Sequence, residues 1–150
     1  MAASTRSSTG VSMRLLSVMV GTAPRPLMEF VRRHMPTAIE ELVVVGRHSG
    51  RDRSLLLTLA DDGPAWYVVH PVPERAGWVA NLKAAGRATI VRTDGTRIPV
   101  QTIYLDDGAE RDAAIEAIIR AQRFPASVGY RLARRGIHDV GRCFRLDPET

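Results

Sequence analysis

Short apolar runs rich in branched residues alternate with glycine, proline and aspartate along this chain. Leu42-Val43-Val44-Val45 is one such run, and its length and composition are typical of a strand. The pattern predicts six strands, at residues 41–45, 54–60, 65–70, 88–92, 96–104 and 141–146. Asp61-Asp62-Gly63 is a strong turn signal, so we expect the first three strands to form an antiparallel meander. Pro99 places the fifth strand at a sheet edge or a bulge, because proline has no N–H for a ladder.

Other segments repeat their apolar positions with the period of a helix. The longest begins near residue 107 and ends near 124, with Ile115 and Ile119 on one face. Residues 78–85 predict a short helix, and residues 126–136 predict either a second short helix or a lid. Residues 11–35 predict two short helices, since prolines interrupt the helical pattern between them.

Together these elements predict the class of fold. A chain of 150 residues is long enough for one domain with a substantial core. We expect residues 1–10 to be a disordered polar tail and residues 11–150 to form a single mainly β domain with helices, of the α+β class. Six antiparallel strands, two N-terminal helices and one long helix before the last strand fit a compact barrel with helices outside.

The connection between the first two strands has the most distinctive chemistry. It reads Gly46-Arg47-His48-Ser49-Gly50-Arg51-Asp52-Arg53, with three arginines and two glycines. Forked guanidinium donors, a hydroxyl and backbone N–H groups left uncovered by glycine suit a phosphate or a carboxylate. Asp52 adds an opposing charge that can pair with Arg51 or Arg53. The alternative interpretation of this segment is a solvated hairpin loop.

Composition narrows the class of partner. The net charge of +5 favours an anionic ligand, but aromatic residues make up only 5% of the chain. Stacking surfaces for nucleic acid are therefore scarce, and we expect a phosphorylated small molecule and no nucleic acid. The single cysteine, Cys143, excludes an internal disulfide and a cysteine-based metal cluster, and we expect it to be buried. No apolar run is long enough to span a membrane and no signal peptide is visible, so a cytoplasmic location is the expectation.

Two motifs in this order resemble a known family. Gly46-Arg47-x-Ser49-Gly50-x-x-Arg53, directly after an apolar strand, is similar to a signature of the deazaflavin-dependent nitroreductase and quinone reductase family. Trp78-Val79-x-Asn81-Leu82-Lys83 resembles the second signature of that family, and the order of strands agrees over roughly residues 14–148. The resemblance implies a split β-barrel of the flavin-binding group. It also implies the deazaflavin coenzyme F-420 as cofactor, whereas some relatives bind FMN and a few bind haem or a lipid.

The resemblance further implies an activity and a set of site residues. Family members pass a hydride to a small planar acceptor, a quinone or a nitro compound, while the protein holds and shields the reactants. The implied cofactor-binding residues are Arg47, His48, Ser49, Gly50, Arg53, His70, Trp78, Asn81 and Lys83. Tyr130 matches a tyrosine that positions the substrate in nitro-reducing members. Split barrels often place the cofactor at a subunit contact, so the resemblance also implies a homodimer.

The sequence departs from the family pattern in two places. Position 48 is often lysine in the family and is His48 here, which is mostly neutral at pH 7. After the third predicted strand, a glycine-containing run is replaced by Val69-His70-Pro71-Val72-Pro73, whose prolines have no N–H to offer a ring. Either the ring is held differently or another ligand takes its place. His70 sustains the second alternative, a non-catalytic carrier of haem or a lipid, because histidine can ligate haem iron.

Two other features have alternative interpretations. Residues 11–35 either pack on the barrel or form a basic amphipathic arm that makes peripheral contact with a membrane surface. The adjacent pair His138-Asp139 is interpreted as a turn rather than a site.

Overall fold

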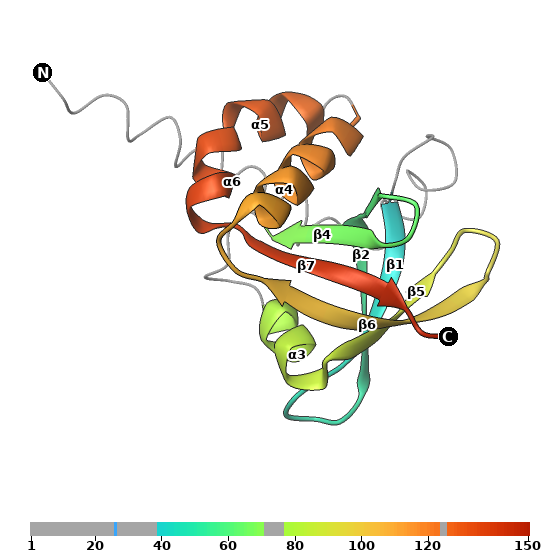
Figure 1. Cartoon of the computed structure of the whole chain (residues 1–150). Coiled ribbons are helices and arrows are strands. Elements are labelled where there is room, and N and C mark those ends of the chain that lie inside the picture. Colours follow the sequence, from blue (N-terminus) through green and yellow to red (C-terminus); the bar gives the residue numbers. More distant parts are fainter. Residues whose placement is uncertain (1–25, 27–38, 71–76, 124–125) are drawn as a thin grey trace, which may run out of the picture.

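The computed structural model of this protein describes residues 39–70, 77–123 and 126–150, together with Pro26 (Figure 1). The predictions for residues 1–10 and 11–35 lie outside the described residues, as does the segment 71–76 with its two prolines. In the part of the chain that is described, no helix combines the length and the hydropathy needed to cross a membrane.

Seven strands form one antiparallel sheet within the described residues, where the sequence pattern predicts six. Their order across the sheet is β2-β1-β5-β6-β7-β4-β3. The strands are β1 (Ile39–Val45), β2 (Asp52–Thr58), β3 (Ala60–Asp61), β4 (Trp66–His70), β5 (Arg87–Val91), β6 (Arg97–Leu105) and β7 (Arg142–Pro148). The predicted count is wrong because the strand expected at residues 54–60 is divided at Leu59 into β2 and β3.

Leu59 marks the point at which the sheet curls. β2 and β3 stand at opposite ends of the strand order, yet this one residue separates them in the chain. The sheet must therefore bend round until its two edges approach each other. Leu59 is buried in the interior of the curl. The outcome is a curled antiparallel half-barrel, which confirms the α+β class.

The predicted pairings of the first three strands are present, although the corner at Leu59 divides the middle strand. β1 pairs with β2, and Ala60 of β3, the end of the second predicted strand, pairs with Tyr67 of β4. The remaining neighbours of β1 and β4 are β5 and β7, which come later in the chain.

The edge position predicted for Pro99 is wrong, because β6 lies between β5 and β7. The carbonyl of Pro99 accepts the N–H of Glu149 just beyond the end of β7. The nitrogen of Pro99 faces that same side, beyond the last residue of β7, so its missing N–H leaves the pairing of β6 with β5 intact.

Each face of the sheet has its own hydrophobic core. Helices α4 (Ala109–Ala121), α5 (Ala126–Leu132) and α6 (Arg134–Val140) cover one face, and α3 (Gly77–Ala85) packs on the other (Figure 1). Neighbouring residues of a strand point to opposite faces, so in β4 Val69 packs under α4–α6 while Val68 joins the core beneath α3. The helix or lid predicted at residues 126–136 is thus two helices, and both contact α4.

A buried arginine fastens the helical layer to the sheet. Arg111 on α4 is only 6% exposed, and its Nη2 donates to the carbonyl of Gly141 at 2.8 Å. Gly141 immediately precedes β7, so this bond fixes α4 against the entry of the last strand. Asp107 and Asp112 lie 3.9 and 3.8 Å from the guanidinium and balance its charge.

Candidate functional site

The turn between β1 and β2 is held by backbone hydrogen bonds across its ends. The N–H of Gly46 donates to the carbonyl of Arg51 at 2.8 Å, and the N–H of Gly50 donates to the carbonyl of Gly46 at 2.9 Å. Gly50 has a φ of +67°, which other residues rarely adopt. A Cβ on the buried Gly46 would lie 2.8 Å from the Oγ of Ser49. The path of the turn therefore favours glycine at both positions.

Arg47 joins this turn to helix α3. Its backbone N–H donates to Oδ1 of Asn81 at 3.1 Å, and its Nη1 donates to the same oxygen at 2.9 Å. Nη1 also donates to the carbonyl of Gly77 at 3.1 Å. Arg47 and Asn81 are 34 positions apart, so only the fold brings them together. The two motifs that carry the family resemblance are thus in direct contact.

Unused hydrogen-bond donors remain where Arg47 meets Asn81. Asn81 uses its carbonyl oxygen for Arg47, and within the described residues the two N–H groups of its amide have no partner. Arg47 keeps the N–H groups on Nε and Nη2, for which no partner is found within the described residues. A guanidinium and an amide NH₂ together suit an oxyanion.

The other predicted residues of the turn are exposed around Arg47. His48, Ser49, Gly50 and Arg53 all face solvent, and Ser49 Oγ accepts the N–H of Arg51 at 3.2 Å. Asp52 makes no ion pair with Arg51 or Arg53 in the part of the chain that is described. The arginines of the turn are therefore not neutralised by their neighbour. Nor does any group of three or more His, Cys, Asp or Glu side chains suited to a metal occur among the described residues.

His70 lies at the end of β4 against Trp78. The ring centroids are 5.4 Å apart with an interplanar angle of 46°, and His70 is only 7% exposed. This burial lowers the pKa of His70 to about 4, so its imidazole is neutral at pH 7. Trp78 directly follows Gly77, whose carbonyl accepts a hydrogen bond from Arg47. The ring centroids of Trp78 and Phe144 are 6.4 Å apart. An aromatic group therefore lies directly beside the arginine turn.

Lys83 is placed away from the arginine turn. It follows Asn81 by two residues, so the two side chains leave the helix axis about 160° apart. The Lys83 ammonium lies 3.9 Å from the centroid of the Tyr104 ring. The structure therefore does not bring Lys83 together with Arg47 and Asn81.

Tyr130 is not beside this site. It is 3% exposed and packs with Ile115, Ile137 and Cys143 in the core beneath α4–α6, on the sheet face opposite α3. Burial raises the pKa of its hydroxyl. A tyrosine enclosed there cannot reach an acceptor next to Trp78, so this arrangement does not support the predicted positioning role. Cys143 is fully buried as expected, and burial raises the pKa of its thiol to about 12.

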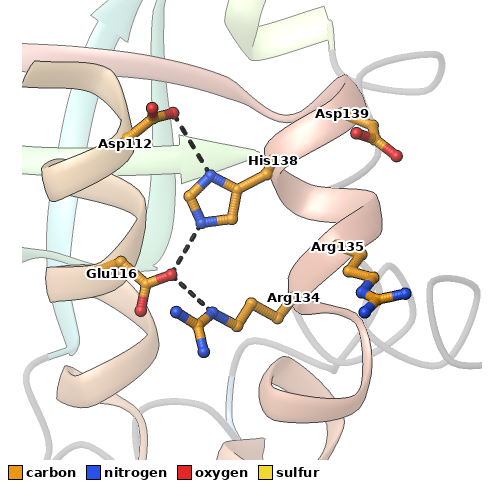
Figure 2. A pocket seen from close by; sticks show the side chains of 6 residues that line it. All are labelled: Asp112, Glu116, Arg134, Arg135, His138 and Asp139. Carbon is orange, nitrogen blue, oxygen red and sulfur yellow. Dashed lines mark hydrogen bonds and ion pairs between the residues drawn. The ribbon is translucent and has the colours of Figure 1, made fainter. Parts of the chain in front are cut away.

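A second polar cluster occupies an open depression of about 480 Å³ between α4 and α6 (Figure 2). His138 bridges two carboxylates of α4, with Nε2 2.8 Å from Oε1 of Glu116 and Nδ1 3.5 Å from Oδ1 of Asp112. Arg134 donates to the same Glu116 oxygen at 2.7 Å. The hydrogen bond with His138, aided by Arg134, lowers the pKa of Glu116. His138 is thus in a helix and not in the expected turn, and its contacts fasten α6 to α4.

Comparison with protein-family models gives no match, and comparison with curated protein sequences gives none either. Solved structures, in contrast, define the class of fold.

An F-420-H₂-dependent reductase is similar with a TM-score of 0.59 at 19% identity, over 73% of this chain and 94% of that one. A structure described as a domain-swapped dimer has the same TM-score and identity, over 82% and 92%. The haem storage protein HutZ of Vibrio cholerae is similar with a TM-score of 0.51 at 15% identity, over 84% and 90%. The chain therefore shares the fold of these proteins, the split β-barrel that the resemblance implies.

Sequence reasoning missed three residues near α3, namely Tyr104, Arg142 and Phe144. Strand pairing brings them there, since Tyr104 lies opposite Phe144 and Arg142 lies opposite His70. Alternation along the last strand is a signal that could have assigned Phe144 to the interior. Nothing in the sequence gives the register that sets Arg142 beside Tyr104.

Proposed function

We propose that this protein is an oxidoreductase that binds the deazaflavin coenzyme F-420 and passes a hydride to a small planar acceptor, such as a quinone or a nitro compound. The observation that carries this proposal is the contact of Arg47 with Asn81, which unites two separate motifs at one cationic corner. The shared fold with an F-420-H₂-dependent reductase supports it.

The residues present fit the anionic end of such a cofactor. Arg47, Arg53, Ser49 and the NH₂ of Asn81 are donors on one side of the barrel, and their chemistry suits a phosphate or carboxylate. Trp78, packed on His70, offers an apolar surface against which a flat ring can be shielded from water. Because His70 is neutral, that surface carries no competing charge. When bound, the reduced deazaflavin supplies the hydride, and the protein's own contribution is binding and orientation.

Titration of the purified protein with F-420 and with FMN tests the proposal. We expect saturable binding of F-420 below about 100 μM, a modest affinity for a cofactor. Arg47→Ala and Arg53→Ala should each weaken binding about tenfold or more, since a charge-assisted contact contributes about 1.5–3 kcal/mol. Arg97→Ala is the matched control, because Arg97 is also an exposed arginine and lies at the start of β6.

Two outcomes would remove the proposal. One is the absence of F-420 binding in this concentration range, and the other is binding that is unchanged by both arginine substitutions. If the protein binds FMN instead of F-420, and the same two arginine substitutions weaken that binding, the proposed site is correct but its cofactor is FMN. Turnover is then followed by the absorbance of the reduced cofactor on adding a quinone or a nitroaromatic acceptor.

A second candidate function is a non-catalytic haem carrier. The observation in its favour is that His70 is neutral, because a neutral imidazole is the form that ligates iron. The shared fold with HutZ is compatible with it. However, His70 is buried against Trp78, so haem could reach it only if the indole moved. A Soret band on adding haem that is lost in His70→Ala would establish this function, and no band would dismiss it.

We also propose that the protein forms a homodimer. Val45, at the end of β1 next to the arginine turn, is 44% exposed, which places an apolar side chain at the surface beside the site. One similar structure is described as a domain-swapped dimer. Light scattering of the purified protein should give twice the chain mass of 16.5 kDa, and the mass of a single chain would refute dimer formation.

A further inference from the structure

Two cationic side chains from different elements converge on Tyr104. The Lys83 ammonium, from α3, lies 3.9 Å from the ring centroid. Nη1 of Arg142, from β7, donates to the hydroxyl of Tyr104 at 3.1 Å. Tyr104 itself lies on β6 and packs edge-on against the buried Phe144, with centroids 5.3 Å apart. Packing against Phe144 therefore holds Tyr104 in place, and Tyr104 contacts both Lys83 and Arg142.

Among the described residues, neither cation is paired with a carboxylate. In the part of the chain that the structure describes, no Asp or Glu lies within ion-pair distance of Lys83 or Arg142. Asp106, which follows the last residue of β6, is exposed and makes no ion pair with Arg142. Arg87, another exposed arginine of the sheet, does pair with Glu149 at 2.7 Å, whereas Arg53 and Arg97 have no ion pair among the described residues. Two like charges held close without a counter-charge favour binding of an anion.

The donors around Tyr104 have a defined chemistry. The Tyr104 hydroxyl accepts from Arg142, so its own proton is free to be donated. Lys83 contributes ammonium N–H groups, and Arg142 keeps the guanidinium N–H groups that do not bond Tyr104. Three elements thus place donors around one tyrosine, and three donors match the three terminal oxygens of a phosphate monoester better than the two oxygens of a carboxylate.

We propose that Lys83, Tyr104 and Arg142 form a phosphate-binding subsite of this protein. It is separate from the donor group of Arg47 and Asn81, since Lys83 and Asn81 leave α3 on nearly opposite sides. It does not depend on the cofactor proposed above. A protein that binds no deazaflavin would still carry this subsite.

Isothermal titration of the full chain with inorganic phosphate, at constant chloride, tests the subsite. We expect a saturable binding event that Lys83→Gln or Arg142→Gln weakens about tenfold and that Arg47→Ala leaves unchanged. Tyr104→Phe keeps the ring under Lys83 but removes the hydroxyl, so it should weaken binding by a smaller factor of about three to ten. Arg142→Lys retains the positive charge, so phosphate binding that survives in Arg142→Lys but is lost in Arg142→Gln is due to the charge and not to misfolding. Arg97→Gln is the control for an unrelated exposed arginine.

The outcomes separate this subsite from the arginine turn. Loss of phosphate binding in Lys83→Gln with no change in Arg47→Ala supports the subsite. Binding that is lost in Arg47→Ala and unchanged in Lys83→Gln assigns the phosphate to the turn and overturns the proposal. No saturable binding, or acetate bound more tightly than phosphate, also overturns it.

Discussion

Substitution of Asn81 probes the contact that unites the two motifs. Oδ1 of Asn81 accepts a neutral backbone N–H and a charged guanidinium N–H, both from Arg47. A neutral hydrogen bond contributes about 1 kcal/mol and one to a charged group about 1.5–3 kcal/mol. Arg47 is exposed and Asn81 is half-buried, so we take the lower part of that range. Asn81→Ala should then lower the free energy of unfolding by about 2 kcal/mol, and Tm by about 4–8 °C.

A double-mutant cycle with Arg47→Ala isolates the guanidinium bond. Arg47→Ala keeps the backbone N–H that bonds Asn81, so the coupling energy reports only the side-chain contact. We expect coupling of about 1 kcal/mol from urea unfolding of the four proteins. If the two single effects add to within about 0.3 kcal/mol, the two side chains are not energetically coupled and the contact does not stabilise the fold.

Asn81→Asp distinguishes a structural role from a binding role. Its carboxylate can accept both bonds from Arg47, so we expect stability close to that of the unsubstituted protein. The added negative charge, however, replaces the two free amide donors and should weaken F-420 binding about tenfold or more. Fluorescence titration measures this loss. Unchanged affinity for F-420 in Asn81→Asp would show that the contact of Asn81 with Arg47 is structural and that the Asn81 amide does not bind the cofactor.

Three further predictions concern other parts of the fold. Arg111→Met should lower the free energy of unfolding by about 2–3 kcal/mol in urea, because it leaves the buried Gly141 carbonyl without its donor, whereas Arg97→Met should change it by less than about 0.5 kcal/mol. Gly141→Ala should cost more than about 2 kcal/mol, since its Cβ would collide with the backbone carbonyl of Ile137, whereas Gly108→Ala meets nothing and should be nearly neutral. Burial lowers the folded-state pKa of His70 to about 4, so the unfolded chain takes up a proton first as pH falls below 6.5, and stability is lost between these values. His70→Phe should flatten this loss, of up to about 3 kcal/mol, in urea unfolding measured from pH 7 to pH 4.5, and an unchanged slope would contradict it.

Most elements of the fold could be predicted from the sequence. Branched apolar runs located β1, β4, β5, β6 and β7 to within about two residues, because local periodicity records which face of a strand is buried. The division of residues 54–60 at Leu59 could not be predicted, since a continuous apolar run carries no sign of a corner. The strand order was equally hidden, because β1 with β5 and β4 with β7 are pairings between distant segments.

The candidate site shows the same division between local and distant information. The composition and glycines of residues 46–53 by themselves determined a tight, cationic turn, because backbone conformation and charge are properties of the local sequence. Only the tertiary structure decided what that turn meets. In the tertiary structure Asn81 contacts Arg47, and Lys83 lies over Tyr104 instead. Tyr130 is buried in the core beneath α4–α6, on the other face of the sheet. Those outcomes depend on strand register and on the angle of each residue around its helix, which no short stretch of sequence records.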